Sequence, residues 1–358
     1  MTRDDILRHY PGDLDTFARL QRDFRAGTRT AAGNTVAGAV TPLGAHDVQY
    51  PPAAGSAAAV ALTARGGAAI KAGQVAVLVL NGGMATRFGS AVKSCCEVYG
   101  GKTFLDLKIE LLARVARAYG VRLTLLLMNS FATEAATQAH LAQHPAPPDV
   151  QVLQFCQSAL PRLTGSGDYF DCDRADLCCY GPGHGDFVYA LQRQGLLAEL
   201  QRQGVTTLQF SNLDNLTATL DPLIIGWHLE QQSAMTVEVA EKREGDKGGM
   251  PVRVDGKLQL VEGFAFPPAF NQESVRVFNT ATYVFALAAL ARPVDLPWYV
   301  VTKEVDGQPV IQFERLAGDL SASLDARYLV VDRDQRFYPI KSQDDLARAR
   351  ERLRQLFA

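Results

Sequence analysis

The feature that most constrains the fold is a continuous apolar run, QVAVLVL at Gln74–Leu80. Valine and leucine without polar alternation predict a strand buried on both faces, as in a parallel sheet. An amphipathic pattern over Thr103–Tyr119 predicts a helix that ends at Gly120, and Val121–Met128 predicts a second buried strand. Strand, helix and strand in this order form a βαβ unit, so we expect an α/β fold.

Further elements extend this pattern along the chain. Strands are expected over Thr206–Ser211, Met235–Glu241 and Lys257–Leu260, and helices over Phe187–Leu200 and Asp344–Leu356. Together they would supply the remaining strands and the covering helices of a central sheet.

The beginning of the chain differs in composition from its centre. Apolar residues at helical spacing predict a helical stretch within residues 1–30, whereas residues 27–60 are rich in Ala, Gly, Thr and Pro and are expected to form irregular surface chain. We therefore divide the chain into an N-terminal helical and irregular extension (1–70), a central domain (71–290) and a closing C-terminal segment (291–358).

Composition excludes several classes of protein. Lys and Arg total 36 against 38 Asp and Glu, a formal net charge of −2, which argues against a nucleic-acid-binding protein and against an acidic disordered chain. No run approaches the roughly 18 apolar residues of a membrane span, and the first residues lack an apolar signal-peptide core. We expect a cytoplasmic enzyme with neither nucleic acid nor membrane as a partner.

The six cysteines point to a reducing compartment, because two adjacent pairs do not resemble a disulfide framework. Cys172, Cys178 and Cys179 lie close to His184 in sequence, but they lack the C-x-x-C spacing of a zinc site. Ordinary half-buried thiols are therefore favoured over a metal centre.

The turn after the first strand carries the richest chemistry. Its sequence is NGGMATRFG over residues 81–89, followed by Lys93. Glycine backbone N–H groups can approach an anion closely, and a lysine can neutralise a phosphate. The spacing fits neither the Walker pattern nor the dinucleotide-binding pattern. From these residues alone, a phosphate-binding loop and a tight turn with a solvated lysine both stay open.

Three other positions depend on context. His184 lies in the run GPGHGD and is either a ligand contact or part of an ordinary turn. Asp214 follows the strand expected over 206–211, where a carboxylate suits Mg²⁺, although a capping role is the alternative. Lys341 is uninformative by itself.

Taken in order, several segments resemble the UTP–glucose-1-phosphate uridylyltransferase family, the eukaryotic-type UDP-sugar pyrophosphorylases. The resemblance spans about residues 74–346 and rests on the joint order of these motifs: LNGGMATRFG with Lys93-Ser94, GKTFLDL, LLMNSF, FCQSALPR, GPGHGD, SNLDNLTAT, DKGG, Phe278-Asn279-Thr280 and residues 339–342. Asn81 and the run MNSF resemble the glucose enzymes more than the N-acetylglucosamine ones.

The resemblance implies a Rossmann-like, GT-A-like nucleotidyltransferase fold, with residues 71–290 as the catalytic domain. Its central sheet would be mixed but mainly parallel and flanked by helices. We do not expect the C-terminal β-helix through which eukaryotic relatives oligomerise. We expect a monomer or a small homo-oligomer.

The family's functional positions carry over residue by residue. Its nucleotide-binding positions match Leu80, Asn81, Gly82, Gly83, Gln157, Gly183, Asn212 and Asp214. Its two phosphate-binding lysines match Lys93 and Lys341, which the resemblance makes the catalytic residues, and its magnesium ligand matches Asp214. Its sugar-phosphate positions match His184, Gly249, Glu262 and Asn279.

The implied reaction converts UTP and glucose 1-phosphate to UDP-glucose and pyrophosphate, with Mg²⁺ as cofactor, by in-line attack of the sugar phosphate on the α-phosphorus. Three residues depart from the family pattern: Ala85 replaces a glycine, Val92 a proline, and Ala281 an asparagine that contacts the sugar. Two alternatives therefore stay open. One is a pyrophosphorylase for galactose 1-phosphate or an N-acetylhexosamine 1-phosphate, and the other is a non-catalytic nucleotide-sugar sensor.

Overall fold

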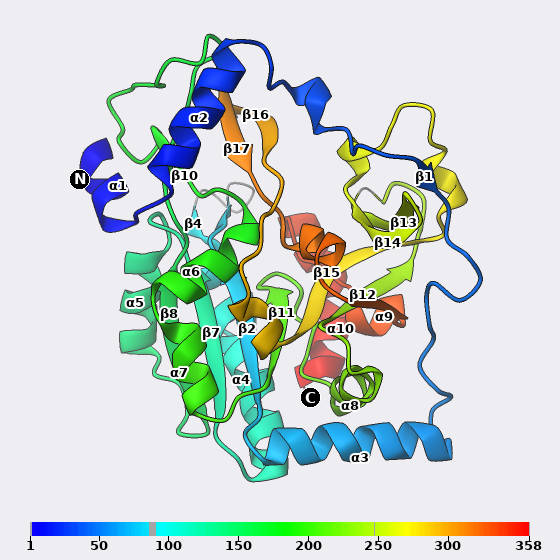
Figure 1. Cartoon of the computed structure of the whole chain (residues 1–358). Helices are drawn as coiled ribbons and strands as arrows, with labels where there is room; N and C mark the ends of the chain where they lie inside the picture. The colour runs from blue at the N-terminus through cyan, green and yellow to red at the C-terminus, as the bar shows by residue number, and fades with distance from the viewer. Residues whose placement is uncertain (1, 86–90, 247, 358) are drawn as a thin grey trace.

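The computed structural model describes residues 2–85, 91–246 and 248–357, and its centre is one seven-stranded sheet (Figure 1). The strand order is β18 (Ala326–Val330), β12 (Met235–Glu241), β15 (Val277–Ala286), β11 (Thr207–Asn212), β2 (Val75–Asn81), β7 (Leu123–Asn129) and β8 (Val150–Cys156). Only β15 runs antiparallel to its neighbours. The predicted α/β fold with a mixed, mainly parallel sheet is confirmed.

The first apolar run of the sequence forms β2, an interior strand that lies between β11 and β7. Leu78 and Val79 are fully buried, as a strand covered on both faces requires. Figure 1 shows α6 (Phe187–Arg193) and α7 (Leu196–Arg202) in front of the sheet and α4 (Phe104–Tyr119) behind it. Since β2, β7, β8 and β11 are parallel, their carboxyl ends meet at one edge, where ligands of open α/β sheets bind.

The helix predicted over 103–119 is confirmed, and its ends follow the sequence closely. The Thr103 hydroxyl and the Asp106 carboxylate form a capping box at its start. Gly120 ends it in the left-handed conformation, with φ 62°.

The single helix predicted over 187–200 is wrong, because the structure has α6 and α7 there. Gly195 separates them with φ 72°, a left-handed conformation that ends one helix and starts the next. The apolar periodicity continues across the break, so it concealed the break in the sequence.

Helix α3 (Ala57–Lys71) was not predicted, and part of it falls in the segment expected to be irregular. It packs on α8 (Pro222–Gln231) through glycines. A Cβ added to Gly66 would lie 1.9 Å from the Pro222 carbonyl oxygen, and one added to Gly226 would lie 1.9 Å from that of Leu62. This contact depends on small residues rather than on an apolar stripe, which is why periodicity missed it.

The helical stretch predicted within residues 1–30 is confirmed as α1 (Arg3–His9) and α2 (Leu14–Arg25). Helix α2 packs on the hairpin of β16 (Tyr299–Val305) and β17 (Gln308–Glu314), where the Phe17 and Phe313 rings lie 5.8 Å apart.

The remaining elements are small. They are β1 (Val40–Thr41), β3 (Met84–Ala85), β4 (Ala91–Val92), β5 (Glu97–Tyr99), β6 (Lys102–Thr103), α5 (Glu134–Gln143), β9 (Leu160–Pro161), β10 (Cys179–Tyr180), β13 (Met250–Val254), β14 (Lys257–Val261), α9 (Arg333–Arg336) and the longer α10 (Gln343–Phe357). Among the described residues, no helix combines the length and the hydropathy that crossing a bilayer would need.

Candidate active site

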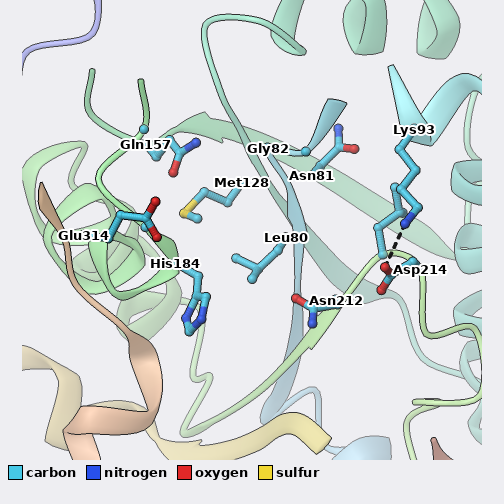
Figure 2. Close-up of a pocket in the computed structure, with 14 residues that line it drawn as sticks. Leu80, Asn81, Gly82, Lys93, Met128, Gln157, His184, Asn212, Asp214 and Glu314 are labelled. Atoms are coloured by element: carbon cyan, nitrogen blue, oxygen red, sulfur yellow. Dashed lines mark hydrogen bonds and ion pairs between the residues drawn. The ribbon is translucent and has the colours of Figure 1, made fainter. Parts of the chain in front are cut away.

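A cavity of about 370 Å³ opens at the carboxyl ends of the parallel strands (Figure 2). Ten of the fourteen residues predicted to form the site line it: Leu80, Asn81, Gly82, Gly83, Lys93, Gln157, Gly183, His184, Asn212 and Asp214. Lys341, Gly249, Glu262 and Asn279 do not. The structure therefore gathers the predicted nucleotide-binding residues, Lys93 and His184 in one place, and puts the other predicted sugar-phosphate residues in a second group.

Lys93 and Asp214 form the charged pair of the cavity. The Lys93 Nζ lies 2.7 Å from the Asp214 Oδ2, and both side chains are about 85% buried, with 16% and 15% of their surface exposed. The same ammonium lies 5.8 Å from the centre of the Phe104 ring. Lys93 opens a short 3₁₀ turn, whereas Asp214 follows the end of β11, so distant segments bring these charges together.

Lys341 approaches Asp214 through the main chain. The Ile340 N–H donates to the Asp214 carbonyl oxygen at 3.0 Å, and Pro339 forms a β-bridge with Asn215. The Lys341 side chain is exposed. The backbone N–H of Lys341 donates to the Asp345 carboxylate at 3.0 Å. The C-terminal segment thus brings the second lysine beside the turn that carries Asp214.

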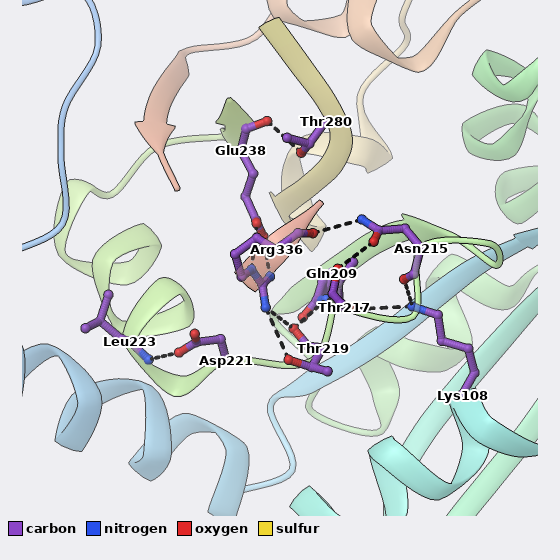
Figure 3. A network of polar contacts seen from close by, with 11 residues as sticks. Lys108, Gln209, Asn215, Thr217, Thr219, Asp221, Leu223, Glu238, Thr280 and Arg336 are labelled. Carbon is purple, nitrogen blue, oxygen red and sulfur yellow. Dashed lines mark hydrogen bonds and ion pairs between the residues drawn. The ribbon is translucent and has the colours of Figure 1, made fainter. Parts of the chain in front are cut away.

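A buried polar network fixes these two segments to each other (Figure 3). The Arg336 guanidinium donates to both Glu238 oxygens, at 2.7 and 2.9 Å. The Asn215 Nδ2 donates to the Arg336 carbonyl oxygen at 2.9 Å, and the Lys108 Nζ donates to the Asn215 carbonyl oxygen at 2.6 Å. Burial lowers the pKa of Lys108 to about 7. Because charged pairs in the interior hold their geometry tightly, the network positions Asp214 and the start of the Lys341 segment.

Side-chain hydrogen bonds of Asn81 fix the start of the glycine turn after β2. The Asn81 Nδ2 donates to the Asn129 Oδ1 at 2.7 Å and to the Thr137 Oγ1 at 2.9 Å. A Cβ on Gly82 would lie 2.8 Å from the Gln157 Nε2, so a larger residue there would displace the end of that side chain. The backbone here is therefore open to a ligand, as a phosphate-binding turn requires.

His184 is held in one tautomer. Its Nδ1 accepts a hydrogen bond from the Ala317 N–H at 2.9 Å, so in the neutral ring the proton is on Nε2. Burial lowers the pKa of His184 to about 4, so the ring is neutral at pH 7. It offers the cavity a hydrogen-bond donor rather than a charge.

The loop before His184 is locked against β17. A Cβ on Gly183, which has φ 86°, would lie 2.5 Å from the Arg315 carbonyl oxygen. The Arg315 guanidinium pairs with the Asp186 carboxylate and stacks 3.5 Å from the Tyr189 ring. Asp186 also accepts the Ser158 N–H at 2.7 Å. The pair therefore joins the loop to the neighbouring strand ends.

Of the predicted sugar-phosphate residues, Gly249, Glu262 and Asn279 form a second cluster. The Asn279 N–H donates to the Gly249 carbonyl oxygen at 2.8 Å, and a Cβ on Gly249 would lie 2.9 Å from the Glu262 Oε1. Glu262 lines a separate cavity of about 680 Å³, and burial raises the pKa of its carboxyl. The 3₁₀ helix Ala317–Ala322 connects the clusters, since Ala317 holds His184 and a Cβ on Gly318 would lie 3.8 Å from the Asn279 Nδ2.

The cavity also contains residues that the sequence did not single out: Met128, Gly181, Leu213 and Glu314. The first three adjoin predicted positions. Glu314 ends β17, and burial raises the pKa of its carboxyl. Sequence offered no signal for it, because β17 was not predicted and its hairpin reaches the cavity only in the folded chain.

Two parts of the predicted motifs lie outside the described residues: positions 86–89 of the glycine motif, and Lys247 of DKGG. Ala281, which replaces an asparagine of the family pattern, lies in a bulge of β15 with φ 56°. Its N–H donates to the Asn279 Oδ1 at 2.9 Å. Asparagine adopts this left-handed conformation more readily than alanine does, so the departure falls at a strained position.

Comparison with known proteins agrees with this geometry. The sequence model of the family described as UTP–glucose-1-phosphate uridylyltransferase matches residues 46–356. The chain belongs to this family. UTP–glucose-1-phosphate uridylyltransferase 2 of Dictyostelium discoideum is 35% identical over 292 residues, which cover 77% of this chain and 58% of that protein. The enzyme of Musa acuminata is 34% identical over 76% of this chain and 62% of its own length. The chain thus spans about three fifths of the length of these family members.

Solved structures with the same fold include two UDP-sugar pyrophosphorylases. A mutant UDP-glucose pyrophosphorylase from Leishmania major, in complex with UDP-glucose, superposes with a TM-score of 0.74 at 26% identity, covering 94% of this chain and 75% of that one. The UDP-N-acetylglucosamine pyrophosphorylase of Trypanosoma brucei gives 0.77 at 23% identity, over 94% and 76% of the two chains. At that identity the second likeness concerns the fold alone.

Proposed function

We propose that the protein is a uridylyltransferase that forms UDP-glucose and pyrophosphate from UTP and glucose 1-phosphate. The observation that carries the proposal is the Lys93–Asp214 pair, 2.7 Å apart, beside the glycine turn of a cavity at the carboxyl ends of the sheet. Family membership supports it. In the step, an oxygen of the sugar phosphate bonds to the α-phosphorus of UTP, and the bond from that phosphorus to the pyrophosphate breaks.

The difficulty of this reaction is electrostatic, and the residues present address it. A sugar phosphate has a second pKa near 6 and is largely dianionic at neutral pH, so no general base is needed. Positioning and charge neutralisation then dominate catalysis. The Lys93 ammonium would neutralise the α-phosphate and the departing pyrophosphate, with the amides of Gly82 and Gly83 completing the cradle. Lys341 would approach the phosphates from the C-terminal segment.

Mg²⁺ fits the donor set of the cavity. Among the described residues no cluster of three or more His, Cys, Asp or Glu side chains could hold a metal by itself. Mg²⁺ in nucleotide sites is commonly bound by one or two carboxylates and completed by phosphates and water, so Asp214 would hold it. When bound, the ion neutralises phosphate charge.

His184 is suited to bind the sugar phosphate. Its neutral ring donates from Nε2, because Nδ1 accepts the Ala317 N–H, and it gains no charge at physiological pH, because burial lowers its pKa to about 4. We assign it to binding rather than to proton transfer. A cytoplasmic location and a monomeric or small homo-oligomeric state complete the proposal, the first supported by six free thiols.

The test is pyrophosphate release measured with UTP, TTP, ATP and GTP against glucose, galactose and N-acetylglucosamine 1-phosphates, with and without Mg²⁺. We expect UTP with glucose 1-phosphate to react fastest, and chelation of Mg²⁺ to abolish the reaction. Ala281 favours one alternative, a different sugar 1-phosphate, which would appear as a different fastest substrate. Binding of UDP-glucose with no pyrophosphate exchange would instead identify a nucleotide-sugar sensor.

A further inference from the structure

Two cysteine thiols meet in the segment between β9 and β10. The Cys172 and Cys178 Sγ atoms lie 3.2 Å apart, and Cys172 is partly exposed whereas Cys178 is buried. The adjacent Cys95 and Cys96 behave differently, since their thiols bond to the carbonyl oxygens of Ala136 and Val92. The contact between Cys172 and Cys178, six residues apart, therefore comes from the fold of this segment and not from neighbouring positions in the sequence.

The chain wraps around both sulfur atoms. The Arg174 carbonyl oxygen lies 3.2 Å from the Cys172 Sγ and 3.5 Å from the Cys178 Sγ. A disulfide needs an S–S distance of about 2.04 Å, so the sulfur atoms have to approach by only about 1.2 Å. A short turn that already encloses both thiols can close this gap with small side-chain rotations.

We propose that Cys172 and Cys178 are a reversible thiol–disulfide site, oxidised by a low-molecular-weight disulfide such as oxidised glutathione. The Cys172 thiolate attacks one sulfur of the oxidant, whose S–S bond breaks and releases the first glutathione thiol. Cys178 then gives up its proton and attacks the Cys172 sulfur, which expels the second glutathione. Two cysteine thiols are oxidised to one disulfide, and one oxidised glutathione is reduced to two thiols.

The order of attack follows from the surroundings of the two thiols. Burial raises the pKa of Cys178 to about 11, and its contact with Cys172 adds to this, so Cys178 is a poor first nucleophile. The partly exposed Cys172 is the thiol that an oxidant in solution reaches first. Transient disulfides of this kind do occur in reducing compartments.

The site lies next to the cavity without forming part of it. The Cys178 carbonyl oxygen accepts the Arg162 N–H at 2.9 Å, and β10 pairs with β9 before the chain reaches Gly181. Since this pairing already fixes β10, closing the disulfide should stabilise the turn and leave the glycine loop in place. We expect a melting temperature about 3 °C higher, from the entropy of the closed loop, and turnover within about twofold of the reduced protein.

The experiment treats the full chain with oxidised glutathione, counts free thiols, and maps tryptic peptides by mass spectrometry. Trypsin cuts after Arg174, so the disulfide joins peptide Leu163–Arg174 to peptide Ala175–Arg193. We expect the loss of two thiols, this linked pair of peptides, and complete reversal by dithiothreitol.

Variants identify the partners, because the second peptide also contains Cys179. Cys178→Ser and Cys172→Ser should abolish the linked peptides, whereas the matched Cys179→Ser and the distant Cys95→Ser should retain them. A stable glutathione adduct on Cys172 with Cys178 still free, or linkage that survives Cys178→Ser, would overturn the proposal. So would more than tenfold loss of turnover on oxidation. The thiol count and the linked peptides do not depend on which sugar the protein uses.

Discussion

At the scale of single residues, the site depends on a balance of charge between two segments. Lys93 and Asp214 are each about 85% buried, so their pairing is little screened by solvent. In the enzyme with its substrates, phosphate oxygens would compete with the Asp214 carboxylate for the Lys93 ammonium. Lys93 could pass from the Asp214 carboxylate to a phosphate oxygen without a change of fold.

Lys93→Ala tests this arrangement. Removing one charge that neutralises the transferring group should lower kcat by about 10²–10³-fold, as for other electrostatic contacts to a transition state. The melting temperature should fall by only a few degrees. Lys102→Ala is the matched control, since Lys102 pairs with Glu110 at the surface and should keep normal turnover. A Lys93→Ala enzyme with near-normal kcat would remove Lys93 from the mechanism.

A buried histidine sets part of the pH dependence of stability. Burial lowers the pKa of His228 to about 4, whereas the unfolded chain keeps an ordinary value near 6.5. The contribution of neutral His228 to the free energy of unfolding is therefore complete above pH 6.5. It is lost as the pH falls toward 4, because over that range only the unfolded state gains the proton. Between pH 7.5 and 5 this costs about 2 kcal/mol of unfolding free energy.

His228→Gln should remove that part of the pH dependence. Urea unfolding at pH 7.5 and pH 5 gives the comparison, and the exposed His9→Gln variant should behave like the wild type. If His228→Gln loses as much stability between the two pH values as the wild type does, the histidine is not buried in its neutral form.

At the scale of elements, the sequence predicted those whose own pattern decides their structure. The strand at 75–81 and the helix at 104–119 have clear periodicity and capping residues, so they could be located closely. Helix α3 could not, because its packing depends on backbone contact at Gly66. Of the site, the glycine turn and Asp214 were predictable from their motifs, whereas Glu314 reaches the cavity only through tertiary folding.

Gly66→Ala tests the crossing of α3 and α8. Alanine favours a helix by about 1 kcal/mol over glycine, but the added methyl would lie 1.9 Å from the Pro222 carbonyl oxygen. The clash should win, with a net loss of about 3 kcal/mol. Gly165→Ala, where a Cβ meets nothing within 4 Å, should stay within about 0.5 kcal/mol of the wild type in the same urea titration. Equal stability of the two variants would contradict the packing described.

At the scale of the whole molecule, the fold brings together segments far apart in the chain. The Asp214 turn receives Lys93 from one side and hydrogen-bonds the main chain just before Lys341, with Arg336 and Glu238 holding both segments from below. Lys93 thus pairs with the Asp214 carboxylate, and the main chain just before Lys341, about 250 residues further along the sequence, bonds to the same turn. In the proposed function, this long-range arrangement, rather than any local motif, would hold the triphosphate.

Lys341→Ala measures whether the exposed second lysine takes part in that site. We expect kcat with UTP and glucose 1-phosphate to fall by about 10–100-fold, with unchanged stability because the side chain is exposed. Lys341→Arg should recover part of the rate. Unchanged turnover in Lys341→Ala would confine phosphate binding to Lys93 and the glycine turn.

The most direct test of the proposed reaction follows the phosphorus atoms. The full chain is incubated with UTP, glucose 1-phosphate and Mg²⁺, and the products are followed by ³¹P NMR. We expect UDP-glucose and pyrophosphate in equal amounts, with both signals absent for Lys93→Ala on the same time scale. Release of inorganic phosphate in place of pyrophosphate, or UTP signals that do not change, would contradict it.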